Sequence, residues 1–144
     1  MTEKDTAFDL QDFLPYLLNQ SAEACGLGFQ KIYKGRYGIL RSEWRVLFHL
    51  GRYGSMPAKE IVARARTHKT KISRAVKALE QKRYLKRERD DADRRLEHLA
   101  LTPAGARVYR DLVEEARRYD AALLARLPPE DAEALRRALK ALAG

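Results

Sequence analysis

The chain of 144 residues is the size of one domain and is long enough to bury a hydrophobic core without disulfide support. The chain has a single cysteine, Cys25, which excludes a disulfide framework and a cysteine-only metal site and fits a reducing cytosol. Neither a targeting peptide nor an apolar run of the roughly 20 residues that a membrane span needs can be identified. The formal net charge is +9, with 29 Lys and Arg against 20 Asp and Glu, which points to a polyanionic partner.

The first predicted helix covers residues 8–33 and carries an apolar stripe at helical spacing in its first half. Residues 35–38, which begin and end with glycine, are expected to break it. Cys25 lies late in this helix among small residues, so we expect it to be a small core residue. The alternative is a redox-sensing role for Cys25, which an unchanged oxidant response in a Cys25→Ser variant would exclude.

Two shorter helices are predicted next. Ser42 is a suitable cap for the first of them, and Gly51 and Gly54 are expected to end it. Pro57 suits the first turn of the second, in which Ile61 belongs to the buried side.

A fourth predicted helix has two different faces. Thr67 or Thr70 is expected to cap it, while Ile72, Val76 and Leu79 form its core face. The opposite face presents hydrogen-bond donors of varied length: Lys69, Thr70, Lys71, Ser73, Arg74 and Lys77. A helix in the major groove of DNA needs such a face. Short hydroxyl side chains allow the helix to approach the DNA closely, arginine forms two hydrogen bonds to the edge of guanine, and lysines neutralise phosphates.

The helical spacing of apolar residues ends after Leu85, and residues 86–101 predict a β-hairpin whose tip, residues 90–93, is charged. Two short helices followed by such a hairpin make a winged helix-turn-helix. Residues 64–95 hold thirteen bases and five acids, and therefore eight of the nine net positive charges. A solvated basic face is the alternative explanation for such a run.

The C-terminal part predicts two more helices. Thr102 caps and Pro103 opens a long helix, and Pro128 and Pro129 separate it from the last one. The terminal helices carry more apolar surface than one small core needs, which favours a partner subunit over packing within one chain.

The predicted fold is mainly α with a small β-hairpin wing, in a single domain over residues 1–144. Residues 38–102 form the winged helix-turn-helix lobe. Residues 6–36 and 103–144 form dimerisation helices.

Several strings resemble the multiple-antibiotic-resistance regulator (MarR) family of bacterial winged-helix transcription factors over nearly the whole chain. They are residues 42–47 (SEWRVL), 72–80 (ISRAVKALE), and 90–95 leading to 99–105 (LALTPAG). The resemblance implies a cytoplasmic, nucleoid-associated protein of a bacterium or archaeon. It further implies a homodimer on a pseudo-palindromic operator, most simply a repressor released by a small ligand.

The resemblance also implies roles for single residues. Asp93 matches an acid that orients Arg95 into the minor groove, where negative potential is concentrated. The chain departs from the family at Ala65-Arg66 and Arg83-Tyr84, where glycine is common. Without glycine a left-handed helix end costs about 1 kcal/mol, so we expect the geometry of these helix ends to differ.

The predicted DNA-contacting residues are Lys69, Thr70, Lys71, Ser73, Arg74, Lys77, Arg87, Arg89, Asp93, Arg94 and Arg95. Arg74 and Thr70 are expected to discriminate sequence, and Arg87 and the lysines to contact phosphates. The alternative function is a sequence-neutral nucleic-acid-binding or architectural protein, which would bind without a preferred palindrome.

A ligand site is predicted at the junction of the first two helices, from Tyr33, Arg36, Tyr37, Trp44, Arg45 and His49. Aromatic rings with an arginine suit an aromatic carboxylate or its thioester, and ordinary core aromatics are the alternative. His49, His68 and His98 lack acids or cysteines at metal-ligand spacing, so no catalytic, metal or cofactor site is predicted; His68 is a candidate phosphate contact.

Overall fold

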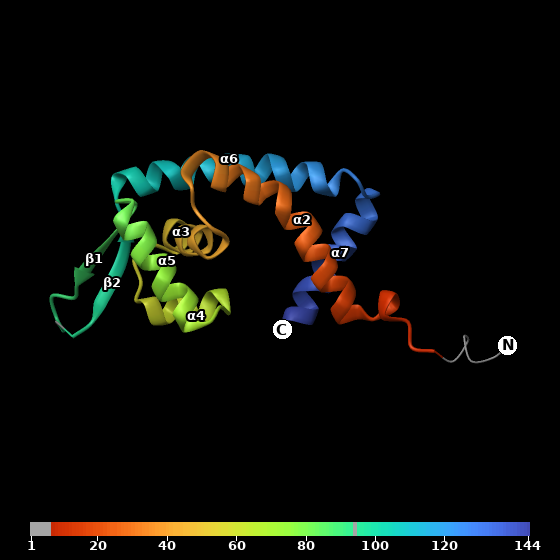
Figure 1. Ribbon diagram of the computed structural model, residues 1–144, viewed down its shortest axis with the longest axis horizontal. Helices are drawn as coiled ribbons and strands as arrows, with labels where there is room; N and C mark the ends of the chain where they lie inside the picture. The colour runs from red at the N-terminus through yellow and green to blue at the C-terminus, as the bar shows by residue number, and fades with distance from the viewer. Residues whose placement is uncertain (1–6, 94) are drawn as a thin grey trace.

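The computed structural model describes residues 7–93 and 95–144, so residue 6 of the first predicted dimerisation segment and Arg94 lie outside the described part. The elements in chain order are η1 (Leu10–Asp12), α2 (Leu14–Tyr37), α3 (Arg41–Tyr53), α4 (Ala58–Ala65), α5 (Lys69–Gln81), β1 (Leu85–Arg89), β2 (Glu97–Leu101), α6 (Pro103–Leu124) and α7 (Pro129–Ala143). Figure 1 shows two parts: a lobe of α3, α4, α5 and the β1–β2 hairpin, and an arm of α2, α6 and α7. The predicted mainly helical winged fold is therefore confirmed.

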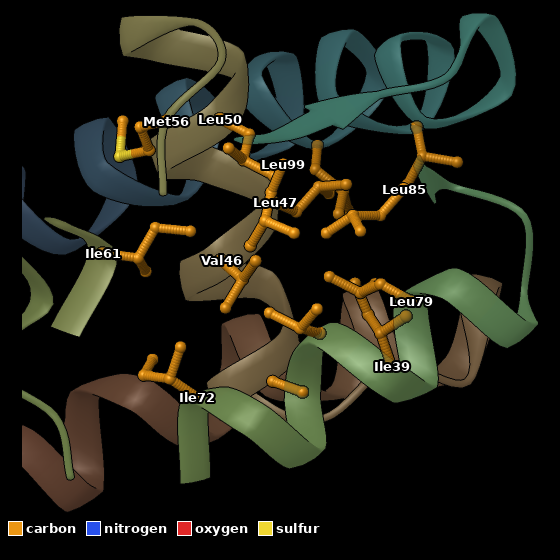
Figure 2. Packing of buried hydrophobic residues seen from close by; sticks show 14 of the residues in the cluster. Ile39, Val46, Leu47, Leu50, Met56, Ile61, Ile72, Leu79, Leu85 and Leu99 are labelled. Atoms are coloured by element: carbon orange, nitrogen blue, oxygen red, sulfur yellow. The ribbon is translucent and has the colours of Figure 1, made fainter. Parts of the chain in front are cut away.

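The lobe is held together by an apolar core to which every one of its elements contributes. Figure 2 shows aliphatic side chains of α3, α4, α5 and the hairpin converging on one another. Leu47, Ile61, Ile72 and Leu79 are almost completely excluded from solvent. Because the apolar side chains of α5 all point into this core, the rest of its surface faces outward.

The wing is an antiparallel hairpin in which Leu85 pairs with Leu101 and Arg89 with Glu97. Met56 forms an additional bridge to Leu99, with backbone hydrogen bonds of 3.1 and 2.8 Å, and so anchors the base of the wing to the lobe. Pro57 follows as the cap residue of α4 rather than in its first turn.

The first helix differs from the prediction at both ends. It begins at Leu14 after a short 3-10 turn, because Pro15 fits the first turn of a helix, where an N–H has no partner. It continues through Gly35 and ends at Gly38, whose φ of 64° is left-handed. The predicted break over residues 35–38 is therefore right for Gly38 and wrong for Gly35.

The predicted cap and end of the second helix need correction. Ser42 lies inside α3, and the helix begins after Leu40, whose backbone N–H donates to Glu43 Oε1 at 3.2 Å. Gly51 is also inside α3, and Gly54 alone ends it. The Glu43 side chain thus does what the Ser42 hydroxyl was expected to do.

The expectation that Cys25 belongs to the core is wrong, because Cys25 is exposed. The backbone there is approached closely by α6: the Tyr119 hydroxyl donates to the Cys25 carbonyl. A Cβ at Gly28 would lie 2.6 Å from the Tyr119 hydroxyl oxygen. Small residues in this part of α2 therefore serve the crossing with α6.

The start of α6 is built as predicted. The Thr102 hydroxyl accepts from the Gly105 N–H at 3.0 Å and donates to the Arg83 carbonyl at 2.6 Å, and Pro103 is the first residue of the helix. This one hydroxyl joins the beginning of α6 to the chain segment that leaves α5.

The two helix ends without glycine nevertheless keep the left-handed conformation. Arg66, after α4, has φ 50°, and Arg83, after α5, has φ 65°. The expectation that these ends differ in geometry is therefore wrong, since the arginines adopt the backbone that glycine would prefer.

Replacement of Arg83 by glycine should stabilise the fold. Glycine adopts a positive φ without the steric cost of a Cβ, so Arg83→Gly is expected to raise the free energy of unfolding by about 1 kcal/mol. Thermal unfolding at fixed protein concentration measures this. A lower melting temperature would mean that the Arg83 side chain makes a stabilising contact that outweighs its strain.

The arm exposes an apolar surface. Exposed apolar residues lie in the segment before α2, in its first turns and along α7: Phe8, Leu10, Phe13, Leu14, Leu17, Leu135, Leu139 and Leu142. Among the described residues, no helix is both long and apolar enough to traverse a lipid bilayer.

Candidate nucleic-acid interface

The outward face of α5 carries all six donors that the sequence assigned to it. Lys69, Thr70, Lys71, Ser73, Arg74 and Lys77 are exposed, while Ile72, Ala75, Val76 and Leu79 are buried. Within the part of the chain that the structure describes, none of the four cations on this face forms an ion pair. Four uncompensated charges and two hydroxyls on one helix face form a surface suited to a polyanion.

The N-terminal end of α5 is capped by His68, so the predicted caps Thr67 and Thr70 are wrong. His68 Nδ1 accepts from the Thr70 N–H at 3.1 Å, which requires an unprotonated Nδ1. The Thr67 hydroxyl instead donates to the Ala65 carbonyl at 3.1 Å. The Thr70 hydroxyl is therefore not consumed by the cap and remains on the exposed face.

The turn of the wing is ordered by its own carboxylates. Asp90 Oδ1 accepts from the Ala92 N–H at 2.8 Å, and Asp90 Oδ2 lies 3.4 Å from His98 Nε2. These bonds, chiefly those from the backbone, lower the pKa of Asp90 below its usual range. His98 is thus a residue of the wing.

Asp93 holds Arg95 at the tip. Asp93 Oδ1 accepts from the backbone N–H of Arg95 at 3.0 Å and from its Nε at 3.2 Å, yet the Arg95 side chain is 91% exposed. The Arg95 side chain is therefore held by Asp93 but still surrounded by solvent, which leaves it free to enter a DNA groove.

Arg87 is placed differently from the cations of α5. Its Nε donates to Glu80 at 3.1 Å and its Nη1 to Glu97 at 2.6 Å, so it joins α5 to both strands. These two carboxylates raise the pKa of Arg87. Because its charge is already compensated, we expect Arg87 to contribute less to phosphate binding than Lys77, while Arg89 lies on the exposed side of the same strand.

Substitution of Asp93 tests the wing tip. Hydrogen bonds from Arg95 lower the pKa of Asp93. Asp93 is therefore ionised at neutral pH, and its hold on Arg95 is lost only as the pH falls through that lowered value. We expect Asp93→Asn to weaken DNA binding several-fold at neutral pH without changing the melting temperature, measured by fluorescence anisotropy and calorimetry. Unchanged affinity would mean that Arg95 binds without this support.

The predicted ligand residues are split between four places. Trp44 lines a hollow of about 460 Å³ between α2, α3 and α6, together with Phe29, Phe48 and Tyr119. Trp44 and Phe29 also line a smaller hollow of about 120 Å³, together with Tyr33 and Arg45. Phe29 packs edge-on against both Tyr33 and Trp44, so the same group of aromatic rings borders both hollows.

Arg36 and Tyr37 lie outside these hollows, at the other end of the α2–α6 crossing. Arg36 donates to Asp111 at 3.0 Å and to Glu115 at 3.0 Å, and the Tyr37 hydroxyl donates to Asp111. Burial and the neighbouring carboxylate raise the pKa of Tyr37 to about 12. These two residues therefore connect α2 to α6 within the arm.

His49 lines a different hollow from the other predicted ligand residues. Its Nδ1 is 2.6 Å from the Arg45 carbonyl, and it borders a separate hollow of about 260 Å³ with Phe48, Tyr53 and Tyr109. No group of three or more His, Cys, Asp or Glu side chains in the described ranges is arranged to hold a metal ion.

Sequence reasoning did not find Phe29 or the α6 residues Tyr109 and Tyr119, which supply much of the aromatic lining. Their signal was available as aromatic side chains on the apolar faces of two predicted helices. It could not be interpreted without knowing that these two helices cross next to α3.

Three comparisons relate the chain to known proteins. A family model described as MarR family matches residues 37–96. YwoH of Bacillus subtilis (strain 168), an uncharacterized HTH-type transcriptional regulator, is 30% identical over 98 residues, covering 68% of this chain and 71% of YwoH.

Solved structures share the fold at low sequence identity. The structure of BpsR from Bordetella bronchiseptica, whose DNA binding is regulated by 6-hydroxynicotinic acid, has a TM-score of 0.86 at 19% identity and covers 95% of this chain and 97% of its own. The S. aureus MepR–DNA complex has a TM-score of 0.79 at 16% identity, covering 91% and 96%.

Proposed function

The chain belongs to the MarR family of transcriptional regulators, which are not enzymes, and from this premise we propose that it is a homodimeric, sequence-specific DNA-binding repressor released by a small ligand. In this proposal α5 of each subunit lies in a major groove and the wing reaches the flanking minor groove.

The observation that carries the proposal is the outer face of α5. Arg74 lies at its centre among Lys69, Lys71 and Lys77, with Thr70 and Ser73 between them. Arginine forks onto the O6 and N7 atoms of guanine, whereas lysines mainly neutralise phosphates. We therefore assign sequence discrimination to Arg74 and Thr70, and affinity to the lysines.

The homodimer is supported by the apolar surface of the arm. Leu135, Leu139 and Leu142 repeat along one side of α7 and are 41%, 41% and 58% exposed. A contiguous apolar surface of this kind is typical of an interface between subunits. A two-fold dimer would present two copies of α5, and half-sites one helical turn apart, about 34–36 Å, would match them.

The proposed ligand site narrows to the two hollows that Trp44 lines. Phe29, Phe48 and Tyr119 offer aromatic surfaces, and the Arg45 guanidinium borders the smaller hollow. This combination suits an aromatic carboxylate or its thioester. The relative BpsR, regulated by an aromatic acid, is consistent with this class.

Selection of bound duplexes from a random-sequence pool tests the proposed function. We expect repeated rounds to enrich a two-fold symmetric sequence, and aromatic acids to be found that lower binding to it. Enrichment without any common sequence, with binding that is only salt-sensitive, would favour the alternative architectural role.

A further inference from the structure

Arg66 connects two helix ends that are far apart in the sequence. Its backbone ends α4 in the left-handed conformation, with φ 50°. Its Nη1 donates to the carbonyl of Ala143, the last residue of α7, at 2.5 Å. In Figure 1 the C-terminal end of α7 lies on the side of the arm that faces α4.

Both contacts have a physical basis. The last carbonyls of a helix have no partner within the helix and carry partial negative charge, so a guanidinium is a favourable cap for them. The left-handed backbone is unfavourable for any residue with a Cβ and persists only where the surrounding structure holds it. At Arg66 the side chain that makes this backbone costly is the one that reaches α7.

The position of Arg66 gives this contact a consequence for DNA reading. Arg66 lies two residues before His68, which caps the N-terminal end of α5. The other end of the contact belongs to α7, whose exposed leucines we assign to the subunit interface. The hydrogen bond between Arg66 and Ala143 therefore connects the turn before α5 to the part of the arm that we assign to the subunit interface.

We propose that Arg66 is a positioning residue that sets the distance between the two α5 helices of the dimer, and hence the half-site spacing that the dimer accepts. This inference rests on the proposed dimeric DNA binding. A direct phosphate contact by Arg66 is the competing role, and it predicts a different salt dependence.

The test compares Arg66→Gly with Arg83→Gly on the selected operator and on versions with one base pair added to or removed from its centre. Each variant loses one charge and one strained φ, but only Arg66→Gly loses the bond to α7. We expect wild type and Arg83→Gly to prefer the original spacing alike. Arg66→Gly should lose about fivefold of that preference, the change expected for the net contribution of one solvent-exposed hydrogen bond, with no fall in melting temperature.

Two results would overturn the inference. One is an unchanged spacing preference in Arg66→Gly. The other is a uniform loss of affinity on all spacings, with the slope of log K against log salt reduced by about 0.9, which would make Arg66 a phosphate contact. A wild-type protein that selects no symmetric operator would instead overturn the proposed function, and this inference with it.

Discussion

Arg74→Ala is expected to lower affinity for the operator by about 1–3 kcal/mol and to relax the preference for one guanine in each half-site. Arg74 is exposed, unpaired among the described residues and central on α5, whereas the opposite side of the helix fills the core. Its loss should therefore remove base contacts without disturbing the fold. Binding to the operator and to variants at each base pair measures both effects.

Lys77→Ala is the matched control, because Lys77 lies three residues further along the same exposed face. This variant should weaken binding to all sequences about equally and reduce the slope of log K against log salt by about 0.9. Equal losses on operator and random DNA for Arg74→Ala would contradict its assignment as the residue that discriminates sequence.

Gly105→Ala is expected to destabilise the protein by about 3 kcal/mol, at the upper end of the range for overpacking. Gly105 is buried in the first turn of α6, where a Cβ would overlap the backbone carbonyl of Tyr84. A backbone obstacle cannot move aside as a flexible side chain can, so α6 would have to shift away from the hairpin. For a chain of this length, the melting temperature should fall by ~10 °C.

Gly35→Ala provides the control for this substitution. Gly35 is also helical, but a Cβ there would meet nothing within 4 Å. Alanine is favoured over glycine inside helices, so Gly35→Ala should stabilise the protein by about 1 kcal/mol. Comparable melting temperatures for the two variants, at the same protein concentration, would contradict the close packing of α6 on the Tyr84 backbone.

The two faces of α5 could be predicted because side-chain period and solvent exposure agree in a helix. Ile72, Val76 and Leu79 recur on one side, and the structure buries all three. The hairpin was predictable because Leu99 and Leu101 occupy alternate positions in its second strand and its tip is acidic. Thr102 and Pro103 also identified the start of α6, because both residue types have local preferences at helix starts.

The wrong predictions concern residues whose position or partner is determined by tertiary contacts. The start of α5 offered two threonines, but His68 is the cap, and nothing local distinguishes these choices. The aromatic residues of the predicted ligand site are close in sequence, yet Tyr37 turns towards Asp111 while Trp44 lines the hollow. Arg87 was assigned to phosphate from its charge, and only the fold shows that Glu80 and Glu97 hold it.

Dimethyl sulfate footprinting of the selected operator tests the placement of α5 and the wing most directly. The reagent methylates guanine N7 in the major groove and adenine N3 in the minor groove. We expect protection of guanines in two blocks about 10 base pairs apart, protection of adenines flanking them, and loss of one guanine protection per half-site with Arg74→Ala. Full occupancy with unprotected guanines would show that α5 does not enter the major groove and would contradict the proposed function.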